Sequence, residues 1–80
     1  MAVFDELKEI IMEIKDIPEE DIVLDSSFAD DLEADSLDIV EMLMMLEEKY
    51  DIQIPEETAE GLKTVQDVVQ YVEARLQENE

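Results

Sequence analysis

The sequence predicts an all-α fold: a four-helix bundle with three longer helices, a short third helix and a long first loop. Apolar residues recur at helical spacing over residues 4–14, 36–50 and 65–76. Strand-like alternation is confined to residues 52–54, which is too short to predict a sheet. With 46% hydrophobic residues in 80, the chain has enough apolar side chains for one compact core.

The first predicted helix begins near Phe4 and ends near Lys15, before Pro18. One face carries apolar residues at three-and-four spacing, and the opposite face is expected to be charged. The apolar positions are Phe4, Leu7, Ile10, Ile11 and Ile14, and the charged positions are Asp5, Glu6, Lys8, Glu9 and Glu13.

Residues 16–35 are predicted to form a long loop, since they hold nine carboxylates, one proline and no helical periodicity. Long ordered loops in small domains usually have a function. The loop is expected to be anchored to the core by scattered apolar residues, namely Ile17, Ile22, Leu24, Phe28 and Leu32.

The second helix is predicted over residues 36–50, which contain no Gly or Pro and consist mostly of good helix formers. It has two apolar stripes where a surface helix needs one. The stripe assigned to the core is Ile39, Met42, Leu43, Leu46 and Tyr50; the second is Leu37, Val40 and Met44. The helix could be buried all round, but the carboxylates beside the second stripe would be costly to bury. An exposed apolar strip rimmed by carboxylates, which fits a partner with a basic patch around a hydrophobic socket, is therefore expected.

A short third helix is predicted to begin at Pro55, with Gly61 ending it in a left-handed conformation. Thr64 and Asp67 have the spacing of a capping box and are expected to open a fourth helix. The predicted buried face of that helix is Val65, Val68, Val69, Val72 and Leu76.

The charge of the chain bears on the partners it can bind. Twenty-five acidic residues against five basic ones give a formal charge of -20, which argues against nucleic-acid binding and for basic protein partners. The acidity is concentrated, because the 33 residues between Lys15 and Lys49 hold 13 carboxylates and no basic residue.

The chain contains no cysteine and no histidine, which excludes disulfides, thiolate catalysis and cysteine metal sites. No dedicated metal site is predicted. The start of the chain lacks the basic and apolar regions of a secretory signal, and no apolar run approaches the length of a membrane span. No membrane insertion is expected, and the predicted location is the cytoplasm, or an organelle matrix if a transit peptide has been removed.

Ser36 is the candidate functional residue, at the junction of the acidic loop and the second helix. A serine at a helix start is ordinarily an N-cap, worth about 1 kcal/mol. The same position favours a phosphate esterified to the hydroxyl, because a helix begins with unpaired N–H groups and a positive dipole end. No base is available to make Ser36 a catalytic nucleophile.

Residues 30–41, centred on Asp35-Ser36-Leu37, resemble the phosphopantetheine attachment signature of acyl carrier proteins. The resemblance continues through residues 46–55 and 64–67. It implies a carrier rather than an enzyme, with covalent 4'-phosphopantetheine transferred from coenzyme A to Ser36 by a phosphopantetheinyl transferase (holo-acyl-carrier-protein synthase). Acyl chains would be held as thioesters on this arm and presented to basic-patch enzymes of fatty acid synthesis.

The resemblance also implies roles for further residues. Asp35 and Leu37 flank the attachment serine. The implied partner-binding surface is Asp35, Leu37, Asp38, Val40, Glu41, Met44, Glu47 and Glu48. The implied acyl pocket is Phe28, Leu46, Ile54, Ala59, Leu62 and Val68. The chain is expected to be one freestanding, monomeric carrier domain over residues 1–80.

Three positions depart from the family pattern. Glu33 replaces a residue that is usually glycine, which places a side chain where a positive φ is favoured. Met45 replaces a residue that is often small, and Tyr50 replaces a common phenylalanine, so its phenol needs water or a polar partner.

Other functions stay open. The cargo could be a polyketide or aminoacyl intermediate, or Ser36 could be a simple phosphorylation site. A non-carrier acidic interaction domain would use Met42, Met44 and Met45 as an adaptable groove. Calcium sensing is excluded, since in an EF-hand loop starting at Asp31 the glycine position is Ser36 and the terminal glutamate position is Met42.

Overall fold

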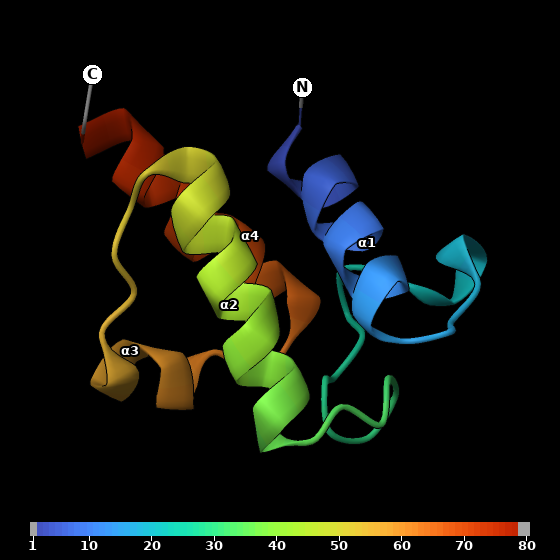
Figure 1. The fold of residues 1–80 in the computed structure, drawn as a ribbon. Helices are drawn as coiled ribbons and strands as arrows, with labels where there is room; N and C mark the ends of the chain where they lie inside the picture. Colours follow the sequence, from blue (N-terminus) through green and yellow to red (C-terminus); the bar gives the residue numbers. More distant parts are fainter. Residues whose placement is uncertain (1, 79–80) are drawn as a thin grey trace.

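The computed structural model describes residues 2–78 and confirms the all-α, four-helix architecture (Figure 1). The helices are α1 (Val3–Ile14), α2 (Ser36–Tyr50), α3 (Glu56–Gly61) and α4 (Val65–Glu78), with a 3-10 turn η1 (Glu19–Asp21) in the long first loop. No sheet forms within residues 2–78, where one isolated bridge pairs Ser27 with Thr64.

The three longer helices enclose a single core. Helix α1 packs against α2 and α4, while the short α3 lies across the bundle near the first half of α2 (Figure 1). Leu7, Leu46, Val65, Val68 and Val72 are fully buried. The predicted helix faces are therefore the ones that pack, although Leu76 at the end of α4 is only partly buried.

The long loop is anchored largely as predicted, by buried Ile22, Phe28 and Leu32. The prediction for Leu24 is wrong, since this side chain is 40% exposed. The loop is held there through its backbone, because the Gln66 N–H donates to the Leu24 carbonyl (2.9 Å). Buried Ser26 stabilises the same bend, as its Oγ accepts from the Val23 N–H and donates to the Asp21 carbonyl.

The structure confirms one predicted helix-end motif and corrects another. The α4 capping box is present: Asp67 N–H donates to Thr64 Oγ1 and Thr64 N–H to Asp67 Oδ2, both at 3.2 Å. The left-handed Gly61 is wrong, because no glycine of residues 2–78 has a positive φ. Gly61 is the last residue of α3, and Leu62 (φ -88°) ends the helix in an extended conformation that packs its side chain against the core.

Glu6 was predicted on the solvent face of the first helix, but it is 5% exposed. Its carboxylate forms an ion pair with Lys49 Nζ of α2 at 2.8 Å. Periodicity within one helix could not show this partner, because Lys49 reaches Glu6 only when α1 and α2 pack together.

Candidate functional site

Ser36 is the first residue of α2 and is exposed to solvent. It is not the N-cap, which corrects the ordinary interpretation of a serine at this position. Asp35 caps the helix in a reciprocal capping box: Asp38 N–H donates to Asp35 Oδ1 (2.9 Å), and Asp35 N–H donates to Asp38 Oδ2 (3.2 Å). The serine hydroxyl is therefore not needed to start the helix.

The first turn of α2 can stabilise a negative charge. Asp38 N–H is paired with Asp35, and Ile39 N–H bonds to the Asp35 carbonyl at 3.1 Å. Within the described residues, the Ser36 and Leu37 N–H groups are the donors left without an acceptor in this turn. Together with the helix dipole, they make the surroundings of the Ser36 hydroxyl favourable for a phosphate ester.

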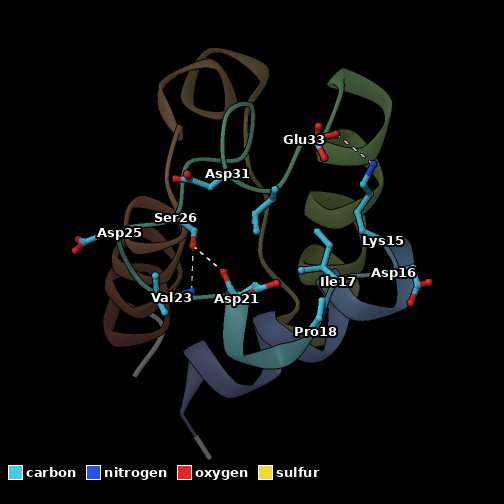
Figure 2. Close-up of a pocket in the computed structure, with 11 residues that line it drawn as sticks. Lys15, Asp16, Ile17, Pro18, Asp21, Val23, Asp25, Ser26, Asp31 and Glu33 are labelled. Atoms are coloured by element: carbon cyan, nitrogen blue, oxygen red, sulfur yellow. Dashed lines mark hydrogen bonds between the residues drawn. The ribbon is translucent and has the colours of Figure 1, made fainter.

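Asp38 is the electrostatic centre of this helix start. The backbone hydrogen bond from Asp35 lowers the pKa of the Asp38 carboxyl, and Lys15 lowers it further. Lys15 Nζ lies 3.3 Å from Asp38 Oδ2. It also donates to the Glu33 carbonyl at 3.2 Å (Figure 2). Glu33, one of the three positions that depart from the family pattern in the sequence, has a φ of 52° and so adopts the left-handed conformation.

Ser36 is accessible to solvent and has no histidine or cysteine beside it. Ser36 Oγ makes no hydrogen bond within residues 2–78, so it is free to react. The sequence provides no histidine or cysteine as a base, and Lys15 is engaged by Glu33 and Asp38. A serine nucleophile ordinarily needs an adjacent base.

A cleft of about 520 Å³ opens beside Ser36, between α2, α3 and the long loop. Of the six residues predicted for an acyl pocket, Phe28, Ala59 and Leu62 line it. Leu46 and Val68 are instead fully buried in the core, and Ile54 packs against the core away from the cleft. These three residues do not line the cavity in this structure.

Sequence reasoning assigned Leu46 of α2 to the pocket and missed the α2 residues that line the cleft. Ile39, Val40 and Leu43 line its wall, and they lie three, four and seven residues after Ser36. This spacing places them on the face of the helix that carries Ser36, so helical geometry could have identified them. The polar residues of the cleft include Asp30, Glu56, Glu60 and Lys63.

The second apolar stripe of α2 is exposed, as predicted: Leu37 is 77% exposed, Val40 52% and Met44 55%. Val40 belongs to both surfaces, since it also lines the cleft. The stripe therefore continues from the outer face of α2 to the cavity beside Ser36.

The carboxylates around this stripe fall into two groups. Asp35, Glu41 and Glu48 are exposed to solvent, although Asp35 is also the helix cap. Asp38 and Glu47 are partly buried and have structural partners; Glu47 Oε2 accepts a hydrogen bond from Ile54 N–H at 2.8 Å. Glu47 thus also holds the segment between α2 and α3.

A second hollow, of about 760 Å³, lies beneath the long loop and is shown in Figure 2. Its lining is mainly polar and includes Asp16, Asp21, Asp25 and Asp31. No group of three or more acidic side chains among residues 2–78 is arranged to hold a metal ion.

In the same part of the chain, no helix has the length and apolar character needed to cross a membrane.

Comparisons with known proteins identify the family of the chain. The family profile described as "Phosphopantetheine attachment site" matches residues 5–72. An acyl carrier protein of Clostridium perfringens (strain SM101) is 56% identical over 69 residues, covering 86% of this chain and 91% of that protein. Acyl carrier proteins of Wolinella succinogenes (51% over 73 residues, 91% and 96% covered) and Bdellovibrio bacteriovorus (49% over 75 residues, 94% and 96% covered) are also similar. The chain belongs to the acyl carrier protein family, whose members are non-enzymatic carriers with a phosphopantetheine attachment site.

Proposed function

We propose that Ser36 is the attachment residue and that a phosphopantetheinyl transferase modifies it with coenzyme A. The observation that carries the proposal is the position of Ser36, which is exposed, without a hydrogen bond on its Oγ, and at the mouth of an apolar cleft. When attached, the group supplies the thiol that this cysteine-free chain lacks, and acyl groups are carried on that thiol as thioesters.

The residues around Ser36 fit such a group. The unpaired N–H groups of Ser36 and Leu37 and the dipole of α2 favour the negative charge of a phosphodiester. Asp35 and Asp38 keep the helix start in place through the capping box, which needs no contribution from the serine hydroxyl.

We also propose that the cleft beside Ser36 shelters the acyl chain. Its volume lies within the range of small-molecule sites, and Phe28, Leu43, Ala59 and Leu62 give it an apolar lining. Burial there would exclude water from the thioester end of the cargo. A mainly apolar cavity suits the fatty acyl intermediates of fatty acid synthesis, which is the pathway class we assign.

The outer face of α2 is proposed as the docking surface for the transferase and for basic-patch enzymes. Leu37, Val40 and Met44 supply the apolar contact, and Glu41 and Glu48 the surrounding charge. Exposed charge pairs raise encounter rates while adding little affinity, which suits a carrier that must be released. In this proposal residues 1–80 act as one monomeric carrier domain in the cytoplasm, or in an organelle matrix.

The attachment is tested by incubating the chain with coenzyme A and a purified phosphopantetheinyl transferase. Mass spectrometry is expected to show the addition of one phosphopantetheine group. Ser36→Ala should abolish the addition, whereas Thr58→Ala, which removes a hydroxyl from neighbouring α3, should retain it. An unchanged mass of the unaltered chain, or equal labelling of Ser36→Ala, would contradict the assignment.

The docking surface is tested with two matched substitutions. Met44→Asp and Val23→Asp each replace an exposed apolar side chain by a carboxylate. The two side chains are similarly exposed (Met44 55%, Val23 51%), but only Met44 lies on α2. We expect Met44→Asp to lower kcat/KM for modification about ten-fold, since a desolvated charge in an apolar contact is costly. Equal effects of the two substitutions would show that α2 is not the docking face.

A further inference from the structure

The residue three positions before Ser36 has an unfavourable backbone conformation. Glu33 has a φ of 52°, in the left-handed region that glycine occupies readily and other residues avoid. This conformation determines the direction in which the chain continues through Ala34 and Asp35 into α2. Contacts that hold Glu33 in place therefore also hold the start of the helix.

Two hydrogen bonds flank this residue. The Ala34 N–H donates to the Phe28 carbonyl at 2.8 Å, within the loop. On the other side, Lys15 Nζ donates to the Glu33 carbonyl at 3.2 Å (Figure 2). The second bond comes from a different element, because Lys15 is the C-cap residue of α1.

Lys15 also contacts the capping box itself. Its Nζ lies 3.3 Å from Asp38 Oδ2, the same oxygen that accepts the Asp35 N–H. The backbone of Lys15 is fixed by a 2.8 Å hydrogen bond from its N–H to the Ile11 carbonyl. Its stem lines a small apolar crevice with Leu32, Ala34 and Ile39, so the charged end is directed from a packed base.

We propose that Lys15 is a positioning residue for the modification of Ser36: from the end of α1 it holds the Glu33 turn and the Asp35–Asp38 capping box in the geometry that presents the serine to the transferase. The inference rests on the proposed attachment at Ser36. Lys15 does not touch the reacting hydroxyl; it acts through Glu33 and Asp38.

The proposal predicts a specific pattern of loss and rescue. Lys15→Met keeps much of the stem but removes the ammonium group, and it is expected to lower kcat/KM for modification about three- to five-fold. The loss is partial because the Ala34 hydrogen bond remains. Lys15→Arg, which keeps a donor and the charge, should stay close to the unaltered rate.

Rescue separates geometry from charge. Adding Glu33→Gly to Lys15→Met should restore the rate, since glycine adopts a positive φ without help. Adding Glu33→Gln removes the same negative charge without this freedom, and should not restore the rate. Lys8→Met is the matched control, because it removes a lysine of α1 that pairs instead with Asp5 and Glu19.

The Cα chemical shift of Glu33 provides a readout that does not depend on the transferase. It should leave the left-handed range in Lys15→Met and remain there in Lys8→Met. Equal rates for these two variants, or rescue by glutamine as complete as by glycine, would overturn the proposal. If the unaltered chain is not modified at all, the assignment of Ser36 fails first, and the Glu33 shift then decides separately whether Lys15 holds the turn.

Discussion

Tyr50, at the end of α2, has a polar hydroxyl in an environment that does not satisfy it. Its hydroxyl is buried and has no hydrogen-bond partner among the described residues. Burial raises the pKa of the phenol, and the nearby Glu6 carboxylate raises it further. A buried hydroxyl without a partner loses its hydration and gains no bond in exchange.

Tyr50→Phe is therefore expected to stabilise the protein. Removing the unpaired hydroxyl should raise the free energy of unfolding by about 1 kcal/mol, because the ring can keep its packing. Urea unfolding at neutral pH, followed by circular dichroism, measures the change. A loss of stability of similar size would mean that the hydroxyl contributes a favourable interaction.

The same cluster predicts how stability changes at alkaline pH. The hydrogen bond and charge of Glu6 raise the pKa of Lys49 above its ordinary 10.5, and the pKa of Tyr50 is raised above 10.0. In both cases the folded state keeps the proton longer than the unfolded state, so stability falls as pH rises beyond about 10. Unfolding curves from pH 8 to 11.5 should show this decline, and it should be shallower in Tyr50→Phe. A decline of equal slope in both proteins would rule out a contribution from Tyr50.

At the scale of single elements, α3 is the weakest helix of the bundle. It has six residues and ends in Gly61, a poor helix former. The glycine is not required by the backbone, since its φ is not positive, and a Cβ placed there would meet no heavy atom within 4 Å.

Gly61→Ala is expected to stabilise the protein by about 0.5–1 kcal/mol, through higher helix propensity and lower entropy of the unfolded chain. A more stable α3, which forms one wall of the cleft, should open less often. Amide hydrogen exchange in residues 56–61 should therefore also slow. Thermal unfolding of the variant and the unaltered chain, run side by side, measures the first effect. Destabilisation would indicate that Gly61 needs a conformation that alanine cannot adopt.

At the scale of the whole molecule, a formal charge of -20 on 80 residues makes self-repulsion a general cost of folding. Salt shortens the range of this repulsion, from about 10 Å at 0.1 M to about 3 Å at 1 M. The melting temperature should therefore rise with NaCl, by roughly 5 °C over this range. Mg²⁺ should raise it more at equal ionic strength, by loosely bridging groups such as Asp30, Asp31, Asp35 and Asp38.

A variant with Glu20→Gln, Glu57→Gln and Glu73→Gln gives the matched control, since all three carboxylates are exposed. It should be more stable in low salt and should respond less to NaCl. A melting temperature that is indifferent to both NaCl and Mg²⁺ would show that repulsion does not limit the stability of this fold.

Local sequence patterns predicted much of the fold, because helix faces and helix caps depend on residues only a few positions apart. The spacing of apolar residues identified the longer helices, and the Thr64–Asp67 pair identified the start of α4. Errors occurred where an element meets another one. Glu6 was predicted on the surface, but the packing of α2 against α1 pairs it with Lys49. Leu24 was predicted as an apolar anchor, but its contact with the first turn of α4 is a hydrogen bond to its backbone carbonyl.

The family, the helical class and the candidate hydroxyl could all be predicted from residue types at fixed spacing along the chain. The set of residues that meet around that hydroxyl depends on how the helices pack. The tertiary structure showed Asp35 rather than Ser36 as the cap, Lys15 crossing from α1 to Glu33, and Ile39 and Leu43 in the wall of the cleft. These contacts join segments far apart in the chain, and only the packing of the helices brings them together.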